Sequence, residues 1–455
     1  MGRFMSSFAP AASDAAPPAS SLYRAVWRWH FYAGLLVLPF LILLAVTGGL
    51  YLFKDEINGL IYRNYLTVAP ADKAPLAASE LIAKATGAVP GDPVRYVPAA
   101  TAASSVEVGV ATADRGTVSV YVDPYDGRVL GSIADSAKLM PILKKIHSLE
   151  YFGWVPNRII EIVAGWAIVL VITGVYLWWP RRRRGGVWAP RLKPGGRVLW
   201  RDLHAVTGLY IGVLILFMAA TGMPWSGFWG AKLNSFIASN GLGYPPEFWE
   251  SVPKSQLPMG HEMHQVNWSL ENEPMPASTE TGATSIGIDK ALGTFAGLGL
   301  AKGYVVDLPS GPEGVYSASL FPDQAENERV IHLDQYSGKP LFDGGFYELG
   351  AGAQAIEWGI SVHQGQEFGR ANQLVMAATC VAIVLMAVSA VVMWWKRRPK
   401  GSLGAPRIPE NYKIAKGVLV IAAAIGILFP LVGASLLAML AIDRLLPARW
   451  REKLA

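Results

Sequence analysis

Histidine is the residue type whose pattern in this chain points most directly to chemistry. The chain has 455 residues, seven histidines and a single cysteine, Cys380. One cysteine excludes a disulfide framework, a thiolate metal cluster and a Cys-x-x-Cys-His haem attachment site. Redox or metal chemistry must therefore depend on imidazole, which is a good axial ligand for haem iron. The positions are His30, His147, His204, His261, His264, His332 and His363.

Four of these histidines lie on an internal repeat. His30, Gly34, Thr47 and Gly48 recur with equal spacing as His204, Gly208, Thr221 and Gly222. His147, Phe152, Gly153 and Trp178-Trp179 recur as His363, Phe368, Gly369 and Trp394-Trp395. Between them, Asp123, Tyr125 and Gly127 recur as Asp334, Tyr336 and Gly338. Three blocks in the same order indicate a duplicated chain.

The duplicated histidines predict two pairs. His30 and His204 lie near the starts of two apolar segments, and His147 and His363 precede the starts of two others. Helical bundles build cofactor sites from side chains on facing helices. We therefore predict two non-covalent b-type haems, each held by two histidines, His30 with His204 and His147 with His363.

Two glycines support this prediction. Gly34 and Gly208 lie one turn beyond their histidines, where a missing side chain lets a flat porphyrin approach the backbone. The alternatives are open: a lone histidine near a span end is usually an interfacial residue, and small residues also suit close helix packing.

Other polar residues near the spans give weaker indications of a function. Arg158 and Arg370 are candidate partners for haem propionates, although arginines at this depth more often meet lipid head groups. Glu161 lies inside an apolar segment, where a charge is costly, and it suits either an ion pair with Arg158 or a proton path.

A second histidine motif lies outside the repeat. His261 and His264 are spaced so that a helix would place them on one face, which makes them candidates for holding a metal or substrate iron. The zinc-protease motif spaces its histidines four apart, so this motif differs from it. His332 precedes a turn in a strand pattern and is interpreted as structural.

The elements that position these residues are membrane spans. Hydrophobic residues make up 52% of the chain and charged residues 16%, whereas soluble proteins carry about 25% charged residues. A helix needs about 20 apolar residues to cross a bilayer. The segments that meet this length are Val26–Phe53, Pro156–Trp179, Leu203–Met223 and Leu374–Trp395. A fifth, Gly417–Ile442, contains Pro430 and predicts a kinked span or a hairpin of two short helices.

Basic residues give the expected orientation. The loop 181–201 is basic without any acidic residue, and the segment 396–416 is also strongly basic. An excess of lysine and arginine marks the cytoplasmic side of a membrane. We therefore expect a multi-pass protein of the bacterial inner membrane, with a cytoplasmic N-terminus and two large periplasmic loops. The positive net charge of +6 is explained by the membrane, so no nucleic acid is expected as a partner.

The expected fold class is an integral membrane, mainly α-helical protein. It has a four-helix haem-binding core from the internal duplication, a C-terminal hydrophobic helix or helical hairpin, and two small periplasmic α+β domains. The expected boundaries are a disordered tail at 1–21, spans at 22–53, 146–180, 202–223 and 356–396 (the second and fourth with an interfacial segment), periplasmic domains at 54–145 and 224–355, cytoplasmic loops at 181–201 and 397–412, the C-terminal membrane segment at 413–446 and a tail at 447–455.

Several motifs resemble the PepSY-associated transmembrane family. They are the His-x-x-x-Gly-Leu starts of two spans, the run His147-Ser-Leu-Glu-Tyr-Phe-Gly, the hairpin Tyr-Val-Asp-Pro-Tyr-Asp-Gly-Arg-Val-Leu and the C-terminal run from Leu428 to Gly433. The family includes inner-membrane di-haem reductases of ferric siderophores, of the ferrioxamine reductase type. The resemblance implies haem ligation at His30, His147, His204 and His363, and two PepSY-like outer domains. The second domain departs from the pattern, because its hairpin lacks the proline after aspartate.

These observations predict a transmembrane ferric-chelate oxidoreductase with no catalytic residue beyond the haem ligands. An electron enters at the cytoplasmic pair, passes to the outer pair and reduces Fe(III) to Fe(II) in a periplasmic ferric siderophore or other ferric chelate. The other partners expected are membrane lipid and a cytoplasmic or quinol electron donor, since no nucleotide-binding fingerprint is present. Two alternatives are a PepSY-displaying regulator or peptidase-inhibiting module without redox activity, and a metal or haem transporter.

Overall fold

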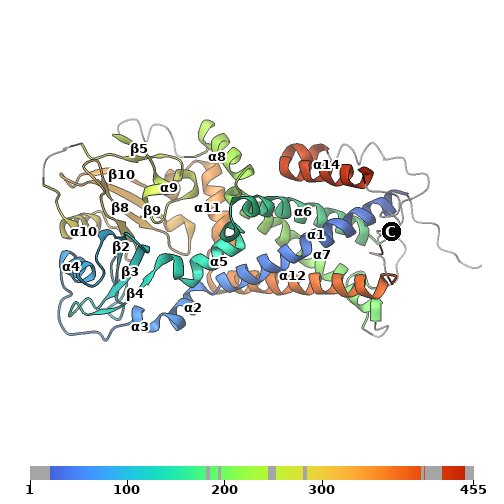
Figure 1. Cartoon of the computed structure of the whole chain (residues 1–455), viewed down its shortest axis with the longest axis horizontal. Coiled ribbons are helices and arrows are strands. Elements are labelled where there is room, and N and C mark those ends of the chain that lie inside the picture. The colour runs from blue at the N-terminus through green and yellow to red at the C-terminus, as the bar shows by residue number, and fades with distance from the viewer. Residues whose placement is uncertain are drawn as a thin grey trace, which may run out of the picture.

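The protein is elongated, with a β-sheet at one end and long helices at the other (Figure 1). The computed structural model describes residues 21–180, 185–192, 196–243, 253–279, 284–400, 404 and 423–445. The expected N-terminal and C-terminal tails and parts of both basic loops lie outside these residues. We call the end that carries the sheet the sheet side, and the opposite end of the long helices the far side.

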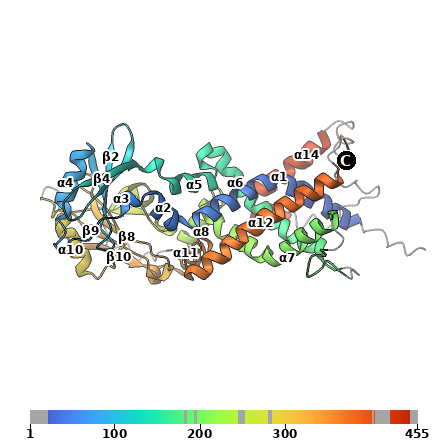
Figure 2. The same cartoon turned by 90° about the horizontal axis from the view of Figure 1, so that it is seen from below.

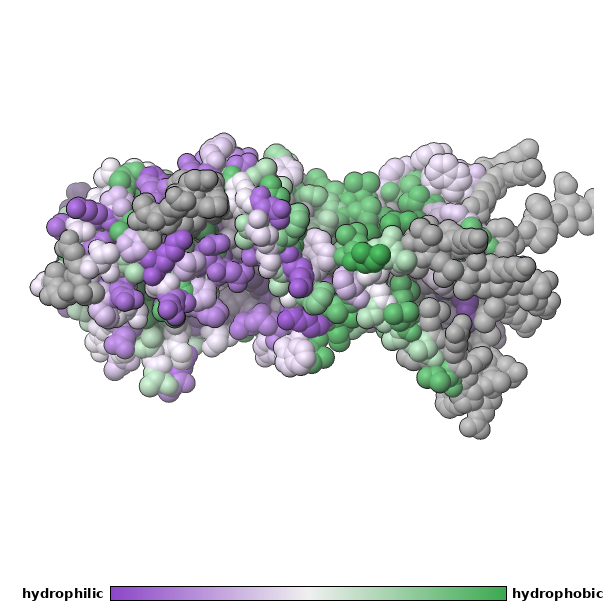
Figure 3. Space-filling view, turned by 90° about the horizontal axis from the view of Figure 1, so that it is seen from above, coloured by the Kyte–Doolittle hydropathy of each residue, from purple (hydrophilic) through white to green (hydrophobic). Residues whose placement is uncertain are grey.

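Four helices are long and apolar enough to cross a membrane, as the sequence predicts. They are α1 (Ser21–Tyr51), α6 (Trp154–Trp178), α7 (Gly196–Gly222) and α12 (Gly369–Arg397). Helix α1 packs against α6 and α12, and α7 packs against the same two helices. Apolar residues surround these helices, and a green band marks this region in Figure 3, whereas the sheet side is largely polar.

The fifth apolar segment is described only from residue 423 onward. Helix α14 (Pro430–Leu445) packs against α6, and the Trp166 indole donates a hydrogen bond to the Ser435 hydroxyl at 3.0 Å. The chain reverses just before α14, because Gly426 and Gly433 lie so close that a Cβ on Gly433 would be 2.7 Å from the Gly426 Cα. The described part therefore has the geometry of a tight bend at Pro430, where the missing amide hydrogen interrupts the helix.

The sheet has eight antiparallel strands in the order β10-β9-β8-β7-β1-β2-β3-β4. The first half of the chain supplies β1 (Asp92–Val97), β2 (Val106–Thr112), β3 (Gly116–Val122) and β4 (Val129–Ala134). The second half supplies β7 (Val305–Asp307), β8 (Val315–Leu320), β9 (Arg329–Asp334) and β10 (Pro340–Gly345). Strands β1 and β7 pair across the middle, with Arg95 opposite Asp307.

This sheet shows that the expected fold class is wrong. The protein is not a mainly helical molecule built on a four-helix haem core with two small separate α+β domains. The two halves instead share one large sheet, and only four described helices qualify as spans. The sequence pattern identifies individual hairpins, but it cannot show that the edge strand of one hairpin set pairs with the edge strand of the other.

The two halves of the sheet repeat the same hairpin. In each, an aspartate carboxylate accepts the backbone N–H of the tyrosine two residues later, at 2.9 Å for both Asp123 and Asp334. Gly127 and Gly338 close these turns with φ of 73° and 72°, a conformation that favours glycine. Helices α4 (Ala78–Ala88) and α10 (Ile288–Gly297) cover one face of the sheet at the end farthest from the long helices (Figures 1 and 2).

Short elements connect the other face of the sheet to the long helices. Helix α2 (Lys54–Ile61) and α3 (Arg63–Leu66) follow α1, and α8 (Trp229–Ser239), β5 (Lys254–Pro258), α9 (Met259–Glu262) and β6 (Pro274–Pro276) follow α7. Helix α5 (Leu139–His147) packs on α1, and α11 (Ala351–His363) packs on α7. Both α5 and α11 end on a histidine of the repeat, so the sheet and the spans together set the positions of His147 and His363.

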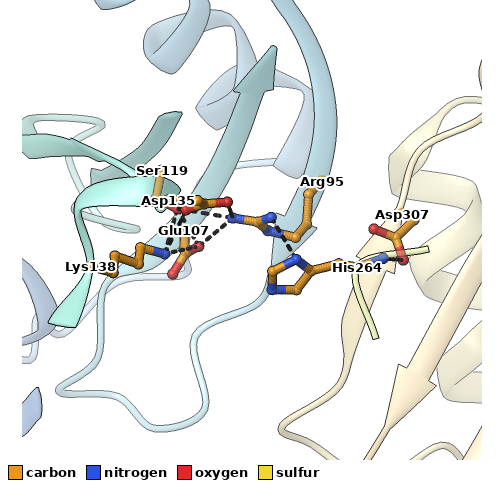
Figure 4. Close-up of polar contacts among 7 residues, drawn as sticks. All are labelled: Arg95, Glu107, Ser119, Asp135, Lys138, His264 and Asp307. Carbon is orange, nitrogen blue, oxygen red and sulfur yellow. Dashed lines mark hydrogen bonds and ion pairs between the residues drawn. The ribbon is translucent and has the colours of Figure 1, made fainter. Parts of the chain in front are cut away.

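An ion-pair cluster joins the two halves of the sheet domain (Figure 4). Arg95 is 3% exposed, and its guanidinium binds Glu107 at 2.8 Å and Asp135 at 3.0 Å. The same side chain donates to Nδ1 of His264 in the second half at 3.0 Å. The His264 backbone N–H in turn donates to Asp307 at 3.1 Å. Arg95 on β1 therefore links β2 and the short helical turn after β4 to the segment that precedes β6.

Arg95→Gln should destabilise the sheet domain by about 1–3 kcal/mol, because Glu107 and Asp135 lose a buried charged hydrogen-bond partner and keep only Lys138, at 3.1 and 3.0 Å. Arg128→Gln is the matched control, since Arg128 is 68% exposed in its ion pairs and such pairs contribute about 0–1 kcal/mol. Thermal unfolding of the full chain in detergent, followed by tryptophan fluorescence, measures both. Equal effects of the two substitutions would contradict the role given to Arg95.

Candidate functional site: two histidine pairs between the long helices

The far-side pair brings together one histidine from each half. His30 on α1 and His204 on α7 have ring centres 6.4 Å apart, with ring planes at 85°. The Nδ1 atom of His30 lies 2.9 Å from the Thr173 hydroxyl on α6, and Nδ1 of His204 lies 3.0 Å from the Met386 carbonyl on α12. All four long helices therefore contribute to this pair.

The hydrogen bonds at Nδ1 define the tautomer of each ring. The Thr173 hydroxyl donates its proton to the Val169 carbonyl at 2.7 Å, so it can only accept from His30. A carbonyl also only accepts, so His204 donates to Met386. Both rings thus carry the proton on Nδ1, and Nε2 keeps its lone pair. A histidine that ligates a metal has this arrangement, with its other nitrogen donating to a protein acceptor.

A cavity of about 400 Å³ surrounds the far-side pair. Its volume lies within the range of small-molecule sites, about 300–1,000 Å³. Both His30 and His204 line it, and so do Gly34 and Gly208, as the sequence predicts. The aromatic side chains in the wall include Trp27, Phe31, Trp178 and Trp394, and the basic ones are Arg197, Arg201 and Arg397. The cavity is thus an apolar chamber with cationic groups in its wall.

The sheet-side pair repeats the same chemistry. The Nδ1 atom of His147 lies 2.9 Å from the Thr47 hydroxyl, and Nδ1 of His363 lies 2.9 Å from the Thr221 hydroxyl. Thr47 donates its proton to the Leu43 carbonyl at 2.7 Å, and Thr221 donates to Phe217 at 2.8 Å. Both hydroxyls therefore accept from the histidines, which again leaves Nε2 with a lone pair.

The two sheet-side rings lie close enough for the charge of one to affect the other. Burial and the neighbouring His147 lower the pKa of His363 to about 4, so both rings are neutral at physiological pH. Glycines flank the rings: a Cβ on Gly48 would be 3.1 Å from His147 Cε1, and a Cβ on Gly222 would be 3.7 Å from His363 Cε1. The structure thus brings together the pairs that the sequence predicts, His30 with His204 and His147 with His363.

The geometry fits a metal held between the rings. None of the four Nε2 atoms has a hydrogen-bond partner in the described part of the chain. An imidazole centre lies about 1.1 Å from Nε2, and histidine binds metals at about 2.0–2.1 Å, so two rings on opposite sides of one metal have centres about 6.3 Å apart. The far-side separation of 6.4 Å matches this value.

The two candidate propionate partners, Arg370 and Arg158, have different environments. Arg370 on α12 forms an ion pair with Glu56 and is exposed. Arg158 lies against Gly227, and its buried Nη1 has no partner among the described residues. Glu161 is 1% exposed and accepts the backbone N–H groups of Phe228 and Trp229 at 3.0 and 3.1 Å, so it caps α8. It forms no ion pair with Arg158 within the described residues.

The second histidine motif has a different environment. His261 is exposed on α9, while His264 accepts from Arg95 through Nδ1 and so carries its proton on Nε2. No group of three or more His, Cys, Asp or Glu residues suited to a metal occurs among the described residues. His332 is fully buried in β9, where its Nδ1 contacts the Ser317 hydroxyl at 2.8 Å.

Sequence reasoning missed the residues that orient the rings. Thr47 and Thr221 each donate to their own helix and also accept from a histidine. Their place on the repeat was a usable signal. Thr173 and the Met386 carbonyl had none, because neither belongs to a repeated motif and a backbone carbonyl leaves no mark in a sequence. The arginines of the cavity wall were assigned only to the membrane surface.

A family model of the PepSY-associated TM region matches residues 27–397. The chain belongs to this family. The match covers the whole sheet, α6, α7, α12 and all but the first turns of α1, so this is a membrane protein with a PepSY-associated transmembrane region. A search of curated proteins found no match to the chain. Assignment to a member of the family with a particular substrate must therefore come from the site itself.

Asp307→Asn should stabilise the sheet domain above pH 6 and not at pH 4. Burial raises the pKa of Asp307 from 3.8 to about 6, whereas the unfolded chain ionises at the lower value. In the wild type, the contribution of Asp307 to the free energy of unfolding is fully present below pH 4. On the order of 3 kcal/mol of it is lost as the pH rises through 6. Asparagine stays neutral throughout. Thermal unfolding at both pH values, with the exposed Asp114→Asn as control, measures the difference; a gain of equal size at pH 4 would refute this assignment.

Proposed function

We propose that the protein is an inner-membrane oxidoreductase that binds two non-covalent b-type haems and passes electrons to a ferric chelate. The observation that carries the proposal is the double histidine arrangement, in which four rings share one tautomer and leave Nε2 without a hydrogen-bond partner in the described part of the chain. A membrane anchor or a peptidase-inhibiting module does not need these buried, oriented imidazoles.

The chain's own residues do three things in this proposal. The four histidines would hold the haem iron, and histidine-held haem would supply electron transfer. Thr47, Thr173, Thr221 and the Met386 carbonyl fix the orientation of the rings. The arginines of the far-side cavity supply positive charge for the carboxylate edge of a porphyrin. Haem, when bound, supplies one-electron redox chemistry that the side chains lack.

The positions of the pairs suit transfer across a membrane. On both α1 and α7, the far-side histidine and the threonine of the sheet-side pair are separated by about 25 Å along the helix, at 1.5 Å per residue. The far side carries Arg197, Arg201 and Arg397, which favours a cytoplasmic location. We therefore propose that the electron donor, a quinol or a cytoplasmic protein, acts on the far side and that the sheet domain is periplasmic.

The proposed acceptor is a ferric siderophore or a similar ferric chelate. The sheet-side pair lies under the sheet domain, at the ends of α5 and α11, and not in the middle of the bilayer. A bulky chelate that cannot cross the membrane can approach this end. Reduction of Fe(III) to Fe(II) weakens binding by hard oxygen ligands, which would release the iron.

Purified protein should contain two haems per chain, both extractable with acid-acetone because no thioether attachment is possible. His30→Ala or His204→Ala should remove the same haem, and His147→Ala or His363→Ala the other. Pyridine haemochrome quantification and reduced-minus-oxidised spectra measure the loss. His261→Ala is the control and should retain both. Haem near zero in a haem-sufficient host would refute the redox function and favour the regulator, and bound metal without porphyrin would favour the transporter.

Ferric siderophore should reoxidise the dithionite-reduced protein in proteoliposomes whose sheet domains face outward. Loss of the outer ligands by His363→Ala should abolish this reoxidation, and His204→Ala should leave a single turnover while blocking electrons supplied from inside. Cupric ion and quinone are tested in parallel. Reoxidation by quinone alone would contradict the iron acceptor and leave the two-haem arrangement standing.

A further inference from the structure

A group of buried carboxylates lies beside the sheet-side histidine pair. Glu328, Glu357 and Glu367 are 6%, 7% and 5% exposed. They come from three places: Glu328 precedes β9, Glu357 is on α11, and Glu367 follows α11. No lysine or arginine forms an ion pair with any of them within the described residues. Three buried carboxylates without a cationic partner cannot all be ionised, because an unpaired buried charge is costly.

Two polar atoms beside these carboxylates lack a hydrogen-bond partner. The Asn267 side-chain amide donates to Glu328 at 2.8 Å, but its carbonyl Oδ1 is buried and has no donor among the described residues. The Ser269 hydroxyl is also buried and unpartnered there. Asn267 is 2% exposed and Ser269 8% exposed. A proton on the carboxyl group of Glu328 provides the kind of donor that a buried amide oxygen requires.

The other members of the cluster are held differently. Glu357 accepts the backbone N–H of Trp268 at 2.9 Å, a contact that favours its ionised form. Glu367 accepts the backbone N–H of Ala325 at 3.1 Å. Glu328 has only the neutral amide of Asn267 as a side-chain partner. The geometry therefore assigns the proton chiefly to Glu328, with Glu357 as its close neighbour.

The surrounding charges agree with this assignment. Burial and the charges of Glu357 and Glu367 raise the pKa of Glu328 to about 9. Burial and the charge of Glu271 raise the pKa of Glu357 to about 7, although two backbone N–H groups act in the opposite direction. Lys144 acts on Glu271, where its charge opposes the effect of burial on the pKa. Burial and mutual repulsion thus favour a proton on this pair, chiefly on Glu328.

The carboxylate pair is connected to the sheet-side histidines by a shared helix and by packed side chains. Glu357 and His363 lie on the same helix, α11, about 9 Å apart along its axis. Between them, Gly359 packs against Thr221, the residue that accepts from His363, and a Cβ on Gly359 would be 3.0 Å from Thr221 Cγ2. The Trp268 indole also donates to the Pro224 carbonyl at the end of α7. A charge placed between His147 and His363 therefore acts on these carboxylates through protein rather than water.

We infer that the Glu328–Glu357 pair is a proton-binding site that takes up one proton from solvent when one electron arrives between His147 and His363. The inference rests on the proposed function. One new O–H bond forms on a carboxylate, one iron centre is reduced from Fe(III) to Fe(II), and the net charge of the buried region does not change. When the electron leaves to the ferric acceptor, the proton returns to solvent.

Infrared spectroscopy of the full chain tests the proton directly and needs no haem. At pH 7 the wild type should show the C=O stretch of a protonated carboxyl group, and Glu328→Gln should remove it. Glu326→Gln is the matched control, since this residue is two positions away and outside the cluster. Glu357→Gln is a second variant in case Glu328→Gln folds poorly, and it should also change the band. A spectrum in which neither variant alters a protonated carboxyl band overturns the inference.

Redox titration of the haem-loaded protein tests the linkage. The midpoint potential of the sheet-side haem should fall with rising pH between 6 and 9, by up to about 59 mV per unit for one proton and one electron. Glu328→Gln and Glu357→Gln should flatten this dependence, while Glu326→Gln should not. A pH-independent wild-type potential overturns the linkage alone. A wild type that holds no haem overturns the linkage together with the proposed function, and the missing haem spectrum identifies that case.

Discussion

The hydrogen bond at Nδ1 of each paired histidine is the interaction on which the site depends. A neutral imidazole has one donor and one acceptor nitrogen, and its partner decides which is which. Three of the four partners are threonine hydroxyls whose protons are already committed to their own helices. Each such hydroxyl acts as a pure acceptor at a fixed position. The Nε2 lone pair of each of the four rings is therefore left without a protein donor among the described residues.

The sheet domain holds the sheet-side rings in place. His147 and His363 are the last residues of α5 and α11, which lie between the sheet and the spans. Helix α5 follows β4 and α11 follows β10 in the chain, and both strands belong to one continuous sheet. The relative position of the two helices is therefore set by strand pairing and by the ion pairs around Arg95. The far-side rings need no such support, since both lie within spans, α1 and α7, that each pack on α6 and α12.

The sequence locates the spans and the paired histidines of this protein better than it predicts the architecture. Apolar length locates the four spans, and the repeat identifies the histidine pairs, because both signals are local or periodic. The single sheet was not predictable, since the pairing of β1 with β7 joins strands that are far apart in the chain and have no distinctive residues. Arg95 and Asp307 look like ordinary surface charges until that pairing places them at a buried seam. The carboxylates Glu328 and Glu357 likewise come together only through tertiary packing.

The central pairing of β1 with β7 also bears on how such a chain could arise. Half of this molecule, ending after its second span, would present β1 as an open edge strand, and open edges recruit another strand. Two copies of such a half could complete each other's sheet in the same antiparallel manner, and their spans would then meet as they do here. Fusion of the two copies removes the symmetry requirement. Each half can then carry its own side chains at the seam, and this is visible in Arg95 on one strand facing Asp307 on the other.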